Sequence, residues 1–301
     1  MIGHGSTNTK ALKISAALLL TYFIAEITVA LVSGSLSLLA DAAHELSTVV
    51  AISVSLVAIK LTHTKPTTKR TFGFRRAETI AALTNGVLLL GMAVFIIVRG
   101  LDRLANPVEM SAAPMFAMAI GGIGLEIASL VIMYRGQKEN LNIRGSFWHV
   151  MNAFLGSIAV IIAAIFIEVG QVYEADTWAG LIFAIILIYA AYGIIRDALR
   201  ILIDATPTRI DITLIDKDLK SIKGVEATHH LHARTVGGGI ETFSGHLVVA
   251  SNRNAQSVLI QAKQLLEKKY GFNLSTIQIE DSSLFESDPK EIEYKSMEKQ
   301  A

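Results

Sequence analysis

The chain of 301 residues lacks cysteine and has few charged side chains. Without cysteine it cannot form disulfides, thiolate nucleophiles or cysteine-based zinc sites, so any bound metal must be held by histidine, carboxylate or neutral oxygen ligands. Asp, Glu, Lys and Arg make up 18% of the residues, against about 25% in soluble domains, and this favours a membrane protein. The net charge of +1 favours neither a nucleic-acid binder nor a binder of acidic ligands.

The sequence also lacks the motifs of common metalloenzymes and nucleotide-binding enzymes. It contains no HExxH pattern, no recognisable pair of nucleophile and base, and no Gly-rich phosphate loop. Gly237-Gly238-Gly239 is not followed by lysine, and it predicts a hairpin turn. Residues 1–9 are short and polar, without the basic and apolar regions of a signal peptide, so we expect no cleaved leader. We therefore expect no enzymatic activity.

Long apolar runs dominate the first two thirds of the chain. The hydrocarbon core of a bilayer, about 30 Å thick, needs roughly 20 apolar residues in a helix. Breakers such as Ser33-Gly34-Ser35 and Asn106-Pro107 separate the runs. The sequence predicts a six-helix transmembrane domain over residues 1–206, in contact with membrane lipid. The six segments are 12–32, 36–61, 77–98, 113–134, 147–170 and 177–199.

The charges between these segments predict the orientation in the membrane. Lys and Arg gather in the second and fourth connections and after the sixth segment, whereas the fifth connection carries only Glu168, Glu174 and Asp176. The third connection has charges of both signs. Because basic loops stay on the cytoplasmic side, we expect both termini in the cytoplasm, and the protein in a plasma or inner membrane.

After Thr206-Pro207 the pattern changes to that of a small cytosolic domain. The periodicities indicate a helix, two strands joined by the glycine turn, a second helix and a third strand. This order predicts an α+β domain over residues 207–285, an αββαβ open-faced sandwich of the ferredoxin-like or heavy-metal-domain-like kind. We expect helices on one face and the third strand beside the first. Residues 286–301 are charged and without periodicity, so we expect a disordered tail.

Ionisable residues within two apolar segments predict an intramembrane metal site. Asp41 and His44 lie in the second segment and His149 lies in the fifth. Such groups are costly in hydrocarbon and persist mainly where they line a pathway or bind something. Thr48 shares a helix face with His44, and Asn152 flanks His149. Neutral imidazole suits Zn²⁺, Co²⁺ or Ni²⁺. The alternative is that each histidine only forms a hydrogen bond between helices.

A second metal site is predicted on the cytosolic sheet. Strand alternation places His232, His246 and Glu280 on the face away from the helices, one on each strand. Two histidines and a carboxylate are a plausible zinc ligand set, which a partner subunit can complete. His229 can contribute from the strand edge and Asp281 from the strand end. The alternative is an ordinary solvated polar face.

Several short stretches also match a known family. They are residues 35–44 (SLSLLADAAH), 71–78 (TFGFRRAE), 142–145 (NIRG), 155–157 (LGS), 230–232 (HLH) and 276–280 (TIQIE). Over residues 10–285 the chain resembles the cation diffusion facilitator family of divalent-metal/proton antiporters, of the zinc-cobalt-cadmium efflux type. The resemblance implies a homodimer that exchanges cytosolic metal for protons by alternating access. It also implies that zinc or another divalent cation is both the substrate and a regulator bound by the cytosolic domain.

The sequence departs from this family at its transport site. The family has His or Asp, three residues and then Asp in both the second and the fifth segments, whereas this chain has Thr48 and Ala153 where those second aspartates are expected. One consequence is that the protein is a non-transporting or hetero-oligomeric paralogue that acts as a metal-sensing scaffold. The other is compensation, for which Glu126 in the fourth segment is a candidate donor.

Compensation requires that the site moves by one helical turn, about 5.4 Å. Asp41, His44, His149 and Asn152 would then form it. Against this, Asp41 has an alternative role as a cap at the 33–37 hairpin.

Overall fold

The computed structural model describes residues 9–62, 66–136, 141–250 and 254–281. The predicted disordered tail, residues 286–301, lies outside these ranges. The chain divides into two compact units, one of residues 1–61 and 81–196 and the other of residues 62–80 and 197–301.

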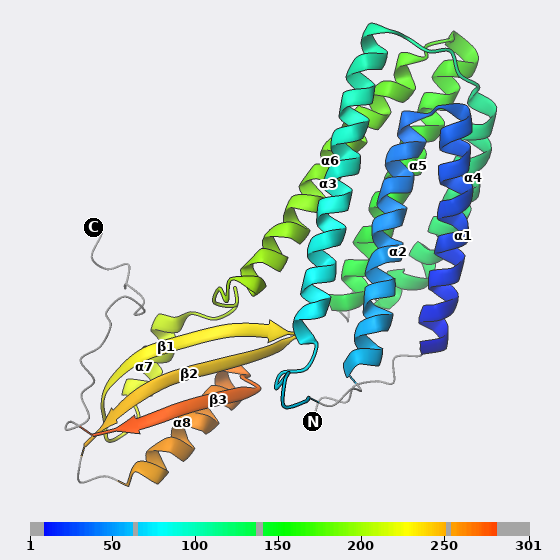
Figure 1. Ribbon diagram of the computed structural model, residues 1–301. Coiled ribbons are helices and arrows are strands. Elements are labelled where there is room, and N and C mark those ends of the chain that lie inside the picture. The colour runs from blue at the N-terminus through cyan, green and yellow to red at the C-terminus, as the bar shows by residue number, and fades with distance from the viewer. Residues whose placement is uncertain (1–8, 63–65, 137–140, 251–253, 282–301) are drawn as a thin grey trace. The chain divides into compact units, whose positions relative to one another are not determined.

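The first unit is built from long helices that run side by side (Figure 1). Four stretches are long and apolar enough to cross a membrane: Leu36–Val54, Arg75–Ala105, Ala153–Gly170 and Glu174–Leu202. The apolar parts of the other two helices, within the described residues, are the shorter Ala17–Ser33 and Ala112–Ala128. The predicted helical membrane fold is confirmed. Its helices are α1 (Thr9–Ser33), α2 (Leu36–Thr62), α3 (Arg75–Ala105), α4 (Ala112–Gly136), α5 (Leu141–Gly170) and α6 (Glu174–Leu202).

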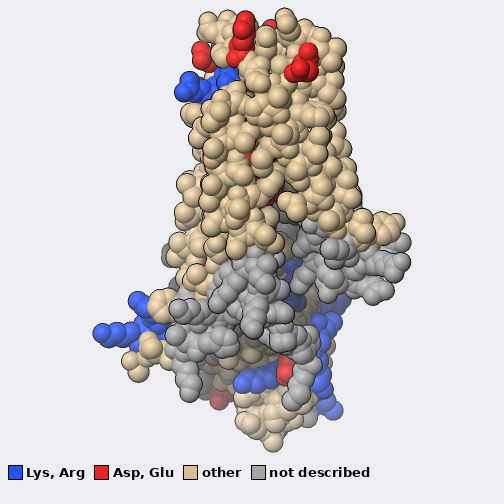
Figure 2. Space-filling model, turned by 90° about the vertical axis from the view of Figure 1, so that its right-hand side faces the viewer, with Lys and Arg blue, Asp and Glu red and all other residues tan. Residues whose placement is uncertain are grey.

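Small side chains let these helices pack closely. Ala119 of α4 and Ala163 and Ala164 of α5 belong to one buried cluster, and Ala40 of α2 and Ala184 of α6 to another. Such residues allow helix backbones to approach each other. The outer surface carries large apolar side chains, and its flank has hardly any charge between its two ends (Figure 2). This distribution is what contact with lipid requires.

The start of α2 is held by Asp176, in the first turn of α6. The Asp176 carboxylate is fully buried and accepts hydrogen bonds from the backbone N–H groups of Leu36 and Ser37, at 2.7 and 3.1 Å. It also accepts one from the Ser35 hydroxyl, which in turn accepts from the Leu38 N–H. The role of Asp41 as the cap is therefore wrong, because Asp176 and Ser35 already satisfy the first amides of α2.

The second unit contains the predicted αββαβ order. Strand β2 pairs antiparallel with β1 and parallel with β3, so the sheet order is β1-β2-β3. The expectation that the third strand lies beside the first is wrong. Since β1 occupies only one edge of β2, the α8 crossover delivers β3 directly to the other edge. The elements are α7 (Ile212–Lys220), β1 (Val225–Gly237), β2 (Ile240–Val249), α8 (Ala255–Tyr270) and β3 (Leu274–Glu280).

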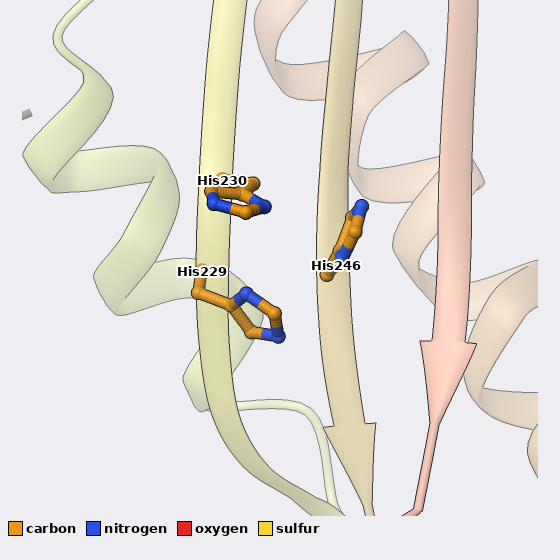
Figure 3. Close-up of side chains that lie close together, drawn as sticks. All are labelled: His229, His230 and His246. Atoms are coloured by element: carbon orange, nitrogen blue, oxygen red, sulfur yellow. The ribbon is translucent and has the colours of Figure 1, made fainter. Parts of the chain in front are cut away.

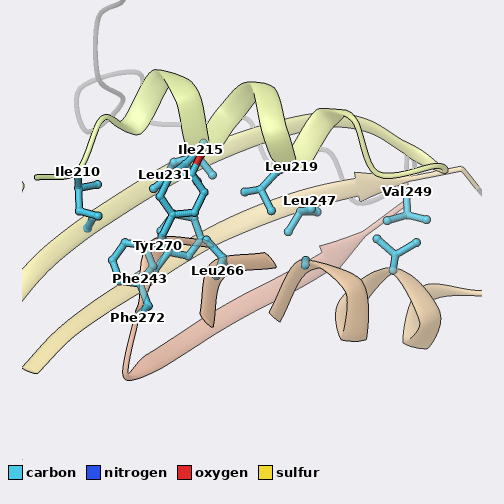
Figure 4. Packing of buried hydrophobic residues seen from close by; sticks show 13 residues of the cluster. Ile210, Ile215, Leu219, Leu231, Phe243, Leu247, Val249, Leu266, Tyr270 and Phe272 are labelled. Carbon is cyan, nitrogen blue, oxygen red and sulfur yellow. The ribbon is translucent and has the colours of Figure 1, made fainter. Parts of the chain in front are cut away.

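Both helices of this unit cover the same face of the sheet (Figure 4). Leu231, Phe243 and Leu247 from the strands pack against Leu219 of α7 and Leu266 of α8. The opposite face carries the polar side chains of the alternating pattern, of which Ser244, Thr276 and Gln278 are exposed. The sheet thus presents one open polar face, as the alternation predicted.

Candidate functional site

A β-bulge in β1 brings consecutive histidines together on the open face of the sheet. His229 pairs with His246 and His232 pairs with Ser244, so β1 has one more residue than β2 in this interval. His230 has a φ of 52°, in the left-handed region that non-glycine residues rarely adopt. In a regular strand His229 and His230 would point to opposite faces. Because of the bulge, both rings lie near that of His246 (Figure 3).

The buried carboxylate of Glu280 joins this group. Its side chain is 1% exposed; Oε2 lies 2.9 Å from Nε2 of His229, and Oε1 lies 2.7 Å from Nδ1 of His246. One ring nitrogen from each of His229, His230 and His246 lies within 4.8 Å of the others. Small side-chain rotations would bring these nitrogens to the distances of a tetrahedral zinc site, about 2.0–2.1 Å from the ion. The arrangement can hold a divalent metal ion.

Some of the predicted cytosolic ligands belong to this histidine–glutamate group, and the others lie beside it. His229, His246 and Glu280 belong to it, whereas His232 is exposed and its ring lies 6.4 Å from that of His230. Partial burial, helped by the nearby His230, His246 and Arg234, lowers the pKa of His232. Asp281 is exposed just after β3.

Sequence reasoning missed His230 as a candidate ligand. The alternation placed His230 on the polar face with His232, but it gave no sign of the bulge that brings His229 to this face and leaves His232 at the margin. The signal that could have found it was this shared face, together with the adjacent His229.

In the first unit, α2 buries three ionisable side chains within little more than one turn. Asp41 is 3% exposed and Glu45 is 9% exposed, while His44 is half-buried with its ring 6.2 Å from that of Phe183. Positions three and four apart share a helix face, so Asp41 lies on one face with His44 and with Glu45. The hydroxyl of Thr48 donates to the His44 carbonyl, 3.2 Å away.

Neighbouring helices add further polar groups beside Asp41. The hydroxyl of Ser157 in α5 donates to Oε1 of Glu126 in α4, at 3.0 Å. The side chains of Ser157 and of the fully buried Glu26 in α1 lie next to Asp41. Gly156 permits this approach, since a Cβ there would lie 3.2 Å from Oδ1 of Asp41. The helices thus concentrate carboxyl groups in the apolar interior of the bundle.

Fewer of the predicted site residues can be examined in the fifth helix. His149 and Asn152 lie in α5, but their side chains lie outside the part of the chain whose side chains the structure describes. Ala153 is buried, at 5% exposure. The set Asp41, His44, His149 and Asn152 therefore stays a prediction.

Comparison with known proteins agrees with this architecture. The family model described as cation efflux transmembrane domain matches residues 12–203, and the model described as cation efflux protein, cytoplasmic domain, matches residues 207–282.

Similar proteins include bacterial transporters whose sequences align with nearly the whole chain. The cadmium, cobalt and zinc/H(+)-K(+) antiporter of Bacillus subtilis (strain 168) is 33% identical, over 93% of this chain and 92% of the relative. The metal cation efflux system protein CzcD of Cupriavidus metallidurans is 31% identical, over 92% and 88%. The zinc transporter ZitB of Escherichia coli (strain K12) is 29% identical, over 86% and 83%.

Proposed function

Because the chain belongs to the cation efflux family, as its resemblance to the cation diffusion facilitators predicted, we propose that it exports a divalent metal ion across the membrane. The transported ion is zinc or another divalent transition-metal ion, since the relatives are named for zinc, cobalt and cadmium. The alternative of a non-transporting scaffold is not supported, since those relatives are named as transporters or efflux proteins.

The observation that carries this proposal is the buried polar cluster around Asp41. Glu26, Asp41 and Glu45 are each at least nine-tenths buried among apolar helices. Transfer of a carboxylate into such surroundings is costly unless a counter-charge or a proton compensates it. A cation that passes through the bundle supplies that counter-charge, and the imidazole of His44 supplies a ligand with affinity for zinc-like ions.

Coupling to protons follows from the same ligands. Imidazole binds metal in its neutral form and releases it when protonated, so His44 and His149 can exchange one for the other as access alternates. We propose that both termini lie in the cytoplasm of a plasma or inner-membrane protein, so that export is driven by protons that enter the cell.

We further propose that the cytosolic unit dimerises and binds a regulatory metal ion. Its match to the cytoplasmic domain of cation efflux proteins supports this role. His229, His230, His246 and Glu280 supply up to four donors on an open sheet face, where a partner subunit can complete the site.

The test is metal flux into proteoliposomes that contain the purified protein, with Zn²⁺, Co²⁺, Cd²⁺, Ni²⁺ and Mn²⁺ compared. We expect flux of at least one ion, its loss in His44→Ala, and its retention in the control Glu168→Gln, which changes an exposed residue near the end of α5. No flux of any ion would contradict the proposed function. Flux that ignores an imposed pH gradient would contradict proton coupling alone.

A further inference from the structure

Three acidic side chains from two helices face one another inside the bundle. Asp41 and Glu45 of α2 and Glu126 of α4 lie within electrostatic range of one another. The hydroxyl of Ser157 is the hydrogen-bond donor to Glu126. Oδ1 of Asp41, Oε2 of Glu45 and Oε2 of Glu126 have no hydrogen-bond partner among the described residues.

Glu26 from α1 points to a ligand independently. Its side chain is fully buried, and the group within hydrogen-bond reach of its carboxyl is the carboxyl of Asp41 rather than a basic or amide donor. The groups around it are the carboxyl of Asp41 beside it, Glu45 and Glu126 within electrostatic range, and the hydroxyl of Tyr22 one turn earlier in α1. Buried carboxyls that lie together without a basic side chain require a proton or a cation between them.

The position of this cluster relates it to the two absent aspartates. Glu45 precedes Thr48 by three residues in α2, and Ser157, which donates to Glu126, follows Ala153 by four in α5. The two helices run in opposite directions, since Leu38 near the start of α2 packs with Ile167 near the end of α5 (Figure 1). The step from Thr48 to Glu45 and the step from Ala153 to Ser157 therefore lead toward the same end of the bundle. Each is about one helical turn, or 5.4 Å.

We propose that Asp41, Glu45 and Glu126, with Glu26 beside them, bind the transported dication in place of carboxylates at positions 48 and 153. This rests on the proposed function and assigns its ligands and its preferred substrate. Two ionised carboxylates neutralise a dication, and the remaining pair can share protons. Because carboxylate and hydroxyl oxygens suit Mn²⁺ better than they suit soft ions such as Cd²⁺, the site favours an oxygen-preferring divalent cation.

The first test is equilibrium binding of Mn²⁺ to the purified full chain in detergent, measured from the electron paramagnetic resonance signal of free Mn²⁺. His229→Ala and His246→Ala are introduced together to silence the cytosolic group. In this background Glu45→Gln and Glu126→Gln should each raise the Kd by about tenfold or more, and the exposed control Glu168→Gln should leave it unchanged. Wild-type affinity in both cluster variants would overturn the proposal.

Two further comparisons keep the result interpretable. Glu45→Asp retains the charge, so it should restore much of the Mn²⁺ affinity that Glu45→Gln loses if the carboxylate is a ligand. Equal loss in Glu45→Asp and Glu45→Gln, with unchanged thermal unfolding, would contradict ligation. Cd²⁺ should displace Mn²⁺ only in excess, and displacement at equal concentration would contradict the oxygen preference.

Flux measurements separate this inference from the proposed function. If the wild type transports a metal and Glu45→Gln with Glu126→Gln transports it equally well, the chain is a transporter whose ligands lie elsewhere, and the inference fails. If the wild type binds Mn²⁺ but transports no ion, and the same variants lose Mn²⁺ binding, the cluster is a metal site and the transport function fails.

Discussion

Glu280 is the residue on which the cytosolic histidine group depends. It is the one carboxylate within 3 Å of both His229 and His246 among the described residues, and its side chain is almost completely buried. Such a carboxylate either binds the metal itself or orients the imidazoles that do. In both cases its negative charge favours a cation at this point of the sheet.

We therefore predict that Glu280→Gln weakens Zn²⁺ binding to the cytosolic group by about 10- to 100-fold. The measurement is competition with a chromophoric chelator, on the purified full chain. Glu226→Gln is the matched control, because Glu226 is an exposed acid near the start of β1. Unchanged affinity in Glu280→Gln would mean that the carboxylate only fixes the sheet.

Among the elements, the bulge of β1 couples backbone strain to metal binding. The left-handed φ of 52° at His230 costs a non-glycine residue about 1–2 kcal/mol. The strain is retained although glycine would remove it, which is the pattern expected where a side chain is needed.

The prediction is a difference between two substitutions. His230→Gly removes both the imidazole and the strain, whereas His230→Ala removes only the imidazole. We expect equal losses of Zn²⁺ affinity, but slower hydrogen exchange of the β1 amides in the glycine variant, by about 1 kcal/mol of local stability. An alanine variant as stable as the glycine variant would refute a strained bulge.

The contact between α7 and α8 gives the cytosolic unit a pH dependence. Hydrogen bonds from Lys269 and from the Tyr270 hydroxyl lower the pKa of Asp218. Between the folded pKa and the unfolded value of about 3.9, the unfolded chain binds more protons, so stability rises with pH in that window. The contribution is complete above about pH 4 and is lost as the pH falls through the folded pKa.

Asp218→Asn should therefore speed hydrogen exchange in α7 at pH 6, and this effect should shrink as the pH falls below about 4. The effect should be small, because the pair is exposed and screened by salt. Half-buried Asp216 makes an ion pair with Lys220 inside α7 and accepts a hydrogen bond from Thr228 of β1, so Asp216→Asn is the control that leaves the α8 contact intact. A difference between wild type and Asp218→Asn that does not shrink as the pH falls below about 4 would contradict this linkage.

For the molecule as a whole, the sequence predicted what depends on local pattern. Apolar run length identified all six long helices, and the periodicities after residue 206 gave the order helix, strand, strand, helix, strand. The alternation along the strands placed His246 and Glu280 on one face. The neighbour of β3 could not be predicted in this way, since the choice of sheet edge is a tertiary property.

The same dependence on tertiary structure explains which site residues could be predicted. Asp41 and Glu126 were recognised because acids in apolar helices stand out. The convergence of Glu26 and Glu45 with them depends on how α1, α2 and α4 are rotated against one another, which no single helix encodes. His232 was chosen in place of His230, because the period of two puts both on the polar face and does not reveal the bulge that brings His229 and His230 to His246.

If both proposed metal sites exist, one in each compact unit, each ion should stabilise its own unit. A ligand at 100 times its Kd stabilises the state that binds it by about 2.7 kcal/mol. Zn²⁺ should therefore slow hydrogen exchange in β1, β2 and β3, and Glu280→Gln should abolish that protection without change in α2 or α4. Mn²⁺ should protect α2 and α4, and Glu45→Gln should abolish this while the strands keep their response to Zn²⁺. A chelator should reverse both effects. If either substitution removed protection from both units, the two sites would be energetically coupled, and regulation would then pass directly from the cytosolic metal to the transport site.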